Sequence, residues 1–306
     1  MSAITREPAP GEFLFPAADW TIGDAIARKA ATTISVCIPA LNEGLTIGHI
    51  VETIRDALAG PDGLVDEIVV LDDRSSDDTA RRAADAGARV VPIESIHASV
   101  GTGRGKGNAL WTSLLASSGD IVVWCDGDVT TLEPSWIVRL VAPLLARPEL
   151  AFVKARYHRP DDQGGGGRTT ELVARPLLSL IEPRLAAIAQ PLAGEMAGRR
   201  TVLEDVPFVQ GWGVELTLLL EIAKRHGVGS IAEVDLGERR HRHHQLEQLA
   251  LQAAEVLVTG LRWAGLDQSS GMVDLIRAGG EHRELNIATR PPISSIVGSG
   301  VLPGGG

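Results

Sequence analysis

Apolar runs of strand length alternate with amphipathic stretches along the first half of the chain. The runs predict four strands, at residues 33–40, 66–73, 88–93 and 120–128. After the first run, apolar residues recur at helical spacing, at Ile47, Ile50, Val51, Ile54 and Leu58. Strands that alternate with helices predict an α/β fold: a mostly parallel, Rossmann-like sheet flanked by helices, with a ligand crevice at the carboxyl ends of its strands.

Local signals refine this pattern. Residues 75–78 (SSDD) match the capping-box pattern and predict the start of a helix that ends before Gly87. A short helix is expected around Thr21–Ala30, with Trp20 anchoring it to the body. The Gly-rich segment 101–107 is expected to be a loop, and residues 108–118 a helix.

Beyond residue 150 the alternation becomes irregular. We expect a strand within 150–160 and a helix within 168–183, which Pro176 either bends or starts. A further helix is expected from Val214, a strand and basic run at 231–244, and a long helix from Leu246. That last helix carries an apolar stripe that fits either the core or a dimer face, at Leu246, Leu249, Ala250, Ala253, Leu257, Val258 and Leu261. These patterns divide the chain into an N-terminal arm and helix (1–32), a first half (33–150), a second half (151–278) and a flexible Gly/Pro/Ser-rich tail (279–306).

Composition excludes several classes of protein. With 44% hydrophobic and 22% charged residues the chain is globular rather than disordered. Its 29 basic and 39 acidic residues give a net charge of −10, which opposes unspecific attraction to nucleic acid or to an anionic membrane. No secretory signal pattern or apolar stretch of about 18 residues occurs, and Cys37 and Cys125 make no disulfide framework, so a cytoplasmic location is expected.

The sharpest chemical signal is the pair of carboxylates in Asp126-Gly127-Asp128. They follow an apolar strand, near Asp72 and Asp73 at the end of another. Carboxylates two residues apart at the end of a strand point to the same side, where they can share a divalent cation with diphosphate oxygens. The alternative is a solvated acidic turn, which the position at the strand end disfavours.

The Gly-rich loop at 101–107 is not a nucleotide-binding motif. A P-loop needs Ser or Thr after its Lys, but Lys106 is followed by Gly107, and the dinucleotide motif GxGxxG fails because Lys106 takes the place of its last glycine. Either this is an ordinary loop, or Lys106 at a helix start helps to bind a phosphate.

Other segments have both a chemical and a structural interpretation. If the basic run 238–244 is extended, His241 and His243 lie on the same side and can bind an ion such as Mn²⁺. The alternative is that the run is a solvated surface. Arg168 and the threonines after it follow Gly164–Gly167 and open a helix. This segment is either a binding site for a small phosphorylated acid or a flexible linker with a Thr cap. Trp212, between two glycines and near Glu215, is either a core residue or a ring that covers a sugar or base.

Together these segments resemble the glucosyl-3-phosphoglycerate synthases, retaining glycosyltransferases of the GT-A fold in glycosyltransferase family 81, with mannosyl-3-phosphoglycerate synthases as close relatives. The resemblance runs from about residue 18 to 265 and is carried, in order, by IPALNEGLTI, LDDRSSDDTA, GRGKGNALW, DIVVWCDGD, GGGRTTELVARPLL, QPLAGE, GWGVE and LGERRHRHH. It implies glucose transfer from UDP-glucose to 3-phosphoglycerate with Mg²⁺ or Mn²⁺, by a homodimer. It makes 33–150 the nucleotide-sugar-binding half and 151–278 the smaller, acceptor-binding half.

The resemblance also implies roles for individual residues. The metal ligands are Asp128 and His241. Residues on the acceptor side are Gly167, Arg168, Thr170 and His243. Residues on the donor side are Pro39, Ala40, Leu41, Glu43, Asp73, Lys106, Asp126, Leu192, Trp212 and Arg239, with Glu195 beside the donor sugar. Glu215, Leu192 and Lys106 are the candidate catalytic residues, with Glu215 as an orienting group.

This sequence departs from the family pattern at several of these positions. Asp73 stands where the family usually has Ser, Trp212 where it has Tyr, and His243 where it has Asn, while Gly127 is expected to loosen the acidic turn. Asp73 opens the alternative of a GDP-mannose or GDP-glucose donor, because a carboxylate can accept hydrogen bonds from guanine. An inverting transferase acting on a lipid phosphate is also disfavoured, because such an enzyme would need a membrane anchor and none is found in this sequence. A sugar-nucleotide-binding regulator without turnover is disfavoured by the acids at 126 and 128.

Overall fold

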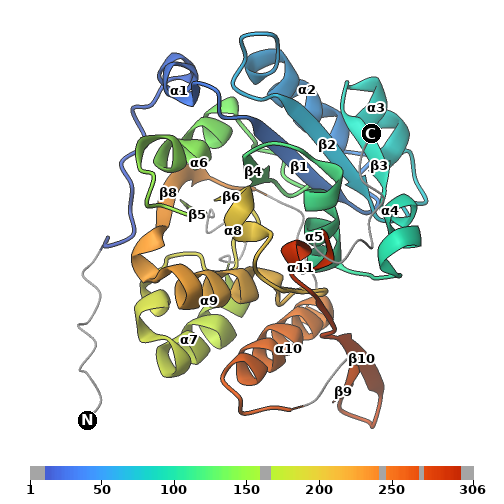
Figure 1. Cartoon of the computed structure of the whole chain (residues 1–306). Coiled ribbons are helices and arrows are strands. Elements are labelled where there is room, and N and C mark those ends of the chain that lie inside the picture. The colour runs from blue at the N-terminus through green and yellow to red at the C-terminus, as the bar shows by residue number, and fades with distance from the viewer. Residues whose placement is uncertain (1–10, 159–166, 241–245, 269–271, 298–306) are drawn as a thin grey trace.

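A seven-stranded sheet forms the centre of the protein in a computed structural model that describes residues 11–158, 167–240, 246–268 and 272–297 (Figure 1). Its strand order is β3 (Arg89–Pro92), β2 (Glu67–Asp72), β1 (Ile34–Ala40), β4 (Ile121–Trp124), β6 (Met196–Arg199), β5 (Phe152–His158) and β8 (Ile231–Glu238). The pairings are parallel, except that β6 runs antiparallel to both β4 and β5. The predicted α/β class with a mostly parallel sheet is therefore confirmed, and both predicted halves of the chain contribute strands to this one sheet.

Helices cover both faces of the sheet because successive strand residues point to opposite sides. In β1, Val36 and Ile38 join one buried apolar cluster and Cys37 the other. The first cluster lies under α1 (Ile22–Lys29), α2 (Ile47–Leu58), α3 (Thr79–Asp85) and α6 (Pro134–Ala146). The second lies under α5 (Lys106–Ala116), α7 (Arg175–Ile181) and α9 (Val214–His226).

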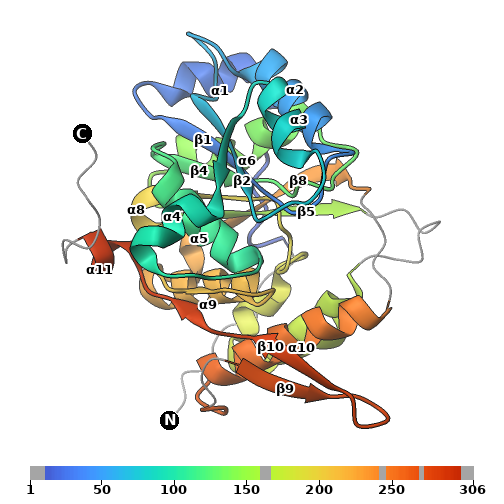
Figure 2. The ribbon, with the colours of Figure 1, turned by 90° about the vertical axis from the view of Figure 1, so that its right-hand side faces the viewer.

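The C-terminal region packs against the second layer. Helix α10 (Leu246–Trp263) contacts α7 and α9, and beside it lies a hairpin of β9 (Met272–Ile276) and β10 (His282–Asn286) (Figure 2). The chain then forms β11 (Thr289–Arg290), which pairs with β7 (Phe208–Val209), and ends its described part in α11 (Ile293–Val297). Residues 282–297 of the predicted flexible tail thus form a strand, a short strand pairing and a helix. Despite their polar composition, they bury Leu285, Ile287, Arg290 and Ile293 against the body.

Most elements predicted from periodicity are confirmed, and the differences arise at their ends. Thr21 caps α1 in a capping box with Asp24, and Trp20 packs against Phe15. The predicted capping box at 75–78 is wrong: α3 begins at Thr79, whose backbone amide and hydroxyl both donate to Asp77.

The remaining helical elements are short. Helix α4 (Ile93–Val100), which the sequence did not predict, precedes the Gly-rich loop. Pro176 lies near the start of α7, after the π-helical turn η2 (Thr170–Ala174). Of its two predicted roles, the position at a helix start is therefore confirmed. The other short elements are η3 (Pro183–Ala187), α8 (Arg200–Leu203) and η4 (Val228–Ser230). Within the described residues, no helix combines the length and apolarity needed to cross a membrane.

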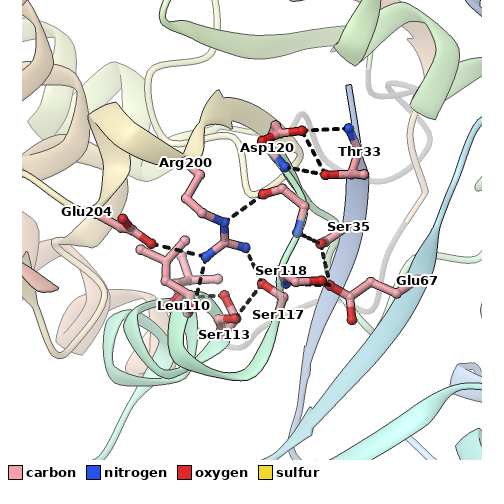
Figure 3. Close-up of polar contacts among 12 residues, drawn as sticks. Thr33, Ser35, Glu67, Leu110, Ser113, Ser117, Ser118, Asp120, Arg200 and Glu204 are labelled. Carbon is pink, nitrogen blue, oxygen red and sulfur yellow. Dashed lines mark hydrogen bonds and ion pairs between the residues drawn. The ribbon is translucent and has the colours of Figure 1, made fainter. Parts of the chain in front are cut away.

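A polar network closes the amino ends of the strands, away from the acids of Asp126-Gly127-Asp128 (Figure 3). The Arg200 guanidinium donates to the carbonyls of Gly119 and Leu114 and to the Ser117 hydroxyl. Glu67, the first residue of β2, accepts from the Ser35 hydroxyl at 2.6 Å, the Ser118 amide at 2.6 Å and the Arg89 guanidinium at 2.7 Å. Burial alone would raise the pKa of Glu67, but these hydrogen bonds outweigh burial and lower it to about 2.

Replacing Glu67 by Gln is therefore expected to lower the free energy of unfolding at pH 7 by about 1–2 kcal/mol. Because the pKa of Glu67 is lower in the folded state, its contribution is complete above about pH 4.5 and is lost as the pH falls toward 2. Urea denaturation of both proteins at pH 7 and pH 3 measures this, with Glu52→Gln on the exposed face of α2 as the control. An equal stability difference at both pH values would contradict the assignment.

Candidate active site

A cavity of about 630 Å³ opens at the carboxyl ends of β1, β2 and β4. With the exception of Glu195, the predicted site residues within the described part of the chain line it: Pro39, Ala40, Leu41, Glu43, Asp73, Lys106, Asp126, Asp128, Gly167, Arg168, Thr170, Leu192, Trp212, Glu215 and Arg239. Two further predicted site residues, His241 and His243, lie outside the described residues. Side chains that are far apart in the sequence are thus brought to one place.

Lys106 begins α5, as predicted, and points at two carboxylates. Its Nζ lies 2.7 Å from Asp126 Oδ1 and 2.8 Å from Glu215 Oε1, and 5.7 Å from the centre of the Trp212 ring. Burial alone would lower the pKa of Lys106, but Asp126 and Glu215 outweigh burial and raise it. Lys106 is therefore a permanent cation at the wall of the cavity.

Arg239 supplies a second cation from the end of β8. Its Nη2 lies 2.8 Å from Asp126 Oδ2 and 3.9 Å from Asp128 Oδ1, while its Nε donates to Glu195 Oε1 at 2.9 Å. Burial would lower the pKa of Arg239, but Glu195, Tyr157 and both aspartates raise it. Asp126 thus joins Lys106 and Arg239, one through each carboxylate oxygen.

Glu195 lies behind this cluster rather than in the cavity. It is fully buried, is absent from the cavity lining and is ion-paired with Arg239. Burial raises its pKa, although Arg239 opposes the shift. The expectation that its side chain lies by the donor sugar is therefore wrong. Glu195 fixes the arginine that faces the cavity.

Of the two predicted metal ligands, Asp128 lies within the described residues. Its carboxylate lines the cavity, and hard oxygen atoms suit Mg²⁺ and Mn²⁺. Within ranges 11–158, 167–240, 246–268 and 272–297, no three His, Cys, Asp or Glu side chains form a metal-binding group. Both carboxylate oxygens of Asp126 are engaged by cations. Among the described residues, the Asp128 carboxylate is thus the oxygen donor at the cavity that could hold such an ion.

The Gly-rich loop is fixed by the C-terminal strand. Gly105 precedes α5 with φ +94°, a conformation that favours glycine, and the amide of Asn108 donates to the carbonyl of Gln210. The buried Arg290 donates to the carbonyls of Val100 and Gly101 and to the Asn108 side chain. The loop is therefore a rigid support for Lys106.

The acidic turn is equally well packed. The hydroxyl of Thr46 donates to the carbonyl of Gly127, and Gly127 lies against the backbone of Pro39. The turn is thus bound to the segment that follows β1, in contrast to the loosening expected from Gly127.

Asp73 does not present a free carboxylate to the cavity. Nε of Arg74 donates to Asp73 Oδ1 at 2.9 Å, and Nη2 of the same arginine donates to this oxygen and to the carbonyl of Gly103. The charge of Asp73 is therefore balanced within the wall. Arg74 thus competes with a bound guanine for Oδ1 of Asp73, while it does not engage Oδ2.

The cavity is also lined by the start of the helix at 168–181. Gly167 has φ +88°, Arg168 is exposed, and Thr170 is buried. This end brings a guanidinium and backbone amides close to the donor-side residues, which suits an anionic second substrate.

Sequence reasoning missed several residues of the lining. Tyr157 lies under the Arg239 guanidinium, 5.3 Å from its ring centre, and Gly194 lies against Asp126. Leu249 and Val256 of α10 also line the cavity, although Val256 was not in the predicted stripe and Leu257, which was, is exposed. Helical periodicity locates an apolar stripe, but it does not tell which cavity the stripe faces.

The comparisons with known proteins agree with this geometry. Residues 35–206 match the sequence profile of glycosyl transferase family 2. A glucosyl-3-phosphoglycerate synthase of Mycolicibacterium smegmatis is 42% identical over 288 residues, which cover 90% of this chain and 94% of that protein. One of Petrotoga mobilis is 41% identical over 81% of this chain and 80% of its own.

The chain belongs to the glucosyl-3-phosphoglycerate synthase family. The crystal structure of the Mycobacterium tuberculosis synthase with Mn²⁺, UDP-glucose and phosphoglyceric acid superimposes with a TM-score of 0.85 at 42% identity, over 92% of this chain and 98% of that one. A second structure of that synthase, with Mg²⁺ and UDP, has a TM-score of 0.82 at 41% identity, over 93% of this chain and 98% of that one. The predicted GT-A fold and the metal-dependent glycosyltransferase class are confirmed.

Gly194 gives a direct test of the site geometry. A Cβ added there would lie 2.2 Å from Asp126 Oδ2, so Gly194→Ala must displace either the segment or the carboxylate. We expect kcat/KM for glycosyl transfer to fall at least about tenfold, roughly 1.4 kcal/mol of transition-state stabilisation. Gly229→Ala is the control, because an added Cβ there meets nothing within 4 Å. Unchanged kcat/KM in Gly194→Ala would show that glycosyl transfer does not need the close contact between residue 194 and the Asp126 carboxylate.

Proposed function

We propose that this chain transfers glucose from UDP-glucose to 3-phosphoglycerate, with Mg²⁺ or Mn²⁺ as cofactor, and retains the anomeric configuration. The observation that carries the proposal is the single cavity in which the donor-side cluster around Asp126 meets the anion-binding end at Arg168. The bound substrates of the Mycobacterium tuberculosis synthase support the same pair of reactants.

The donor base is proposed to be uracil. Pro39, Ala40 and Leu41 line the donor side of the cavity, and Arg74 already balances the charge of Asp73. A guanine would need a free acceptor at that position. GDP-mannose or GDP-glucose is the alternative donor, and it rests on Asp73 alone.

The metal is proposed to bind Asp128 and His241 together with the donor diphosphate. When bound, it stabilises negative charge on the leaving diphosphate, which Lys106 and Arg239 also face as permanent cations. The acceptor phosphate or carboxylate is proposed to bind Gly167, Arg168 and Thr170, with His243 nearby.

Retention is proposed to occur by attack on the front face of the sugar. The candidate nucleophiles Asp126 and Glu215 are both ion-paired with Lys106, which suits them to orient groups rather than to form a covalent bond with the sugar. The bond from the anomeric carbon to the diphosphate breaks, the acceptor hydroxyl oxygen bonds to that carbon, and its proton passes to the departing phosphate. Leu192, at the cavity wall, is proposed to face the sugar through its backbone.

We also propose a cytoplasmic location and a homodimer. Cys37 and Cys125 are free and buried, and burial raises the pKa of Cys37 to about 11, which suits structural thiols in a reducing compartment. The apolar stripe predicted on α10, of which Leu257 is exposed, is the proposed partner surface. Light scattering tests the dimer, since a mass of one chain at micromolar concentration would exclude it.

The direct test is incubation of the purified protein with UDP-glucose, GDP-glucose, GDP-mannose or UDP alone, together with 3-phosphoglycerate and Mn²⁺. Glucosyl-3-phosphoglycerate should form from UDP-glucose, with retained configuration by NMR, and chelation should abolish its formation. A hundredfold preference for a GDP donor would overturn the donor assignment, and no product from any donor would overturn the function.

Arg168→Ala tests the acceptor site. Loss of the guanidinium should raise the KM for 3-phosphoglycerate at least about tenfold, while the Kd for UDP with Mn²⁺ stays within about twofold. Arg81→Ala, on the exposed surface of α3, is the matched control. A weaker affinity for UDP with an unchanged acceptor KM would place Arg168 on the donor side instead.

A further inference from the structure

A second lysine, which no function so far explains, is buried behind the cavity wall. Lys154 in β5 is fully buried, in register with Met196 of β6 and Glu233 of β8. Its Nζ donates to the carbonyl oxygen of Ala193 and lies 3.7 Å from the sulfur of Met196. Fully buried lysines are rare, because an ammonium group loses its hydration on burial.

The surroundings do not fully compensate this loss. Burial lowers the pKa of Lys154 to about 8, and Lys106 of α5 also lowers it. The carboxylates of Glu215 on α9, Glu195 before β6 and Asp126 after β4 oppose the shift, while Glu233 on β8 binds the amide of Ala189 instead. Replacing such a group by an apolar side chain of similar length is often neutral or stabilising. Folding alone therefore gives no reason for a lysine here.

The residue that Lys154 binds lies in the segment that faces the donor. Ala193 is flanked by Leu192 and Gly194, both of which line the cavity, and Gly194 lies against the Asp126 carboxylate. The segment has no helix or strand of its own between Ile188 and Glu195. Charged side chains fix it instead, since Arg175 donates to the carbonyls of Ala186, Ile188 and Ala189.

We propose that Lys154 is a positioning residue for sugar transfer, whose ammonium group fixes the backbone of Ala193 so that Leu192 and Gly194 face the donor sugar. Lys154 does not line the cavity and touches no substrate. Its effect passes through one hydrogen bond to a backbone carbonyl. The proposal rests on the proposed glucosyl transfer for its kinetic consequence, but its structural consequence is measurable without turnover.

The test compares Lys154→Met with Val153→Ala. The first keeps the length of the side chain and removes the charge. The second makes a cavity on the opposite face of the same strand, in the other apolar cluster. Each variant is assayed for kcat, for both KM values, for its melting temperature at pH 7, and for hydrogen exchange of the peptide that covers residues 190–195.

We expect Lys154→Met to melt at or above the wild-type temperature, to exchange the amides of 190–195 roughly tenfold faster, and to lose at least tenfold in kcat with both KM values within threefold. Val153→Ala should melt lower and show neither local effect. Wild-type exchange in that peptide would overturn the proposal whatever the kinetics show. A fall in melting temperature as large as that of Val153→Ala would also overturn it, by making Lys154 a purely structural residue. Wild-type turnover in the same assay tests the proposed function separately.

The pH dependence of stability gives a further check on the buried charge. Since the pKa of Lys154 is lower in the folded state than in the unfolded one, the unfolded chain binds more protons above about pH 8, and wild-type stability from this group rises with pH. The stability advantage of Lys154→Met should therefore shrink between pH 7 and pH 9.5. An advantage that does not change over this range would contradict burial of a charged ammonium.

Discussion

One carboxylate, that of Asp126, joins the two cations on which the geometry of the site depends. Its Oδ1 contacts Lys106 at the start of α5, and its Oδ2 contacts Arg239 at the end of β8. The three residues come from different parts of the chain and meet only because β4 lies at the centre of the sheet. Three further residues contact this cluster: Glu215 through Lys106, Glu195 through Arg239, and Gly194 through Asp126 itself.

Such a cluster is costly to bury and works only if each member is paired. Removing one partner from a buried ion pair leaves an uncompensated charge, which is far less favourable than the intact pair. The two ends of the sheet therefore carry different kinds of polar group. Its amino end carries a hydrogen-bonded network around Glu67 and Arg200 that stabilises the fold (Figure 3), while its carboxyl end carries the ion pairs of Asp126 at the wall of the cavity. Lys154 belongs to the second group, although it lies one layer behind the cavity.

The sequence was sufficient for the features that depend on local pattern. Strands ending in acids predicted the crevice, and the order of motifs predicted the family and the lining residues from Pro39 to Arg239. Features that depend on tertiary contacts were missed. The contact of Arg74 with Gly103, the burial of Glu195 behind Arg239 and the contact of Lys154 with Ala193 involve side chains whose partners no spacing reveals. The C-terminal strands were missed because a few buried anchors, such as Arg290, order a segment of loop-like composition.

We propose that the cations bound to Asp126 create the diphosphate site. Calorimetric titration of Lys106→Met with UDP and Mn²⁺ tests it most directly, since this change removes one cation and leaves Asp126 and Glu215 without their shared partner. We expect the Kd for UDP to rise at least about tenfold, or about 1.4 kcal/mol, in a protein that remains folded. A Kd for UDP equal to that of the wild type would contradict it.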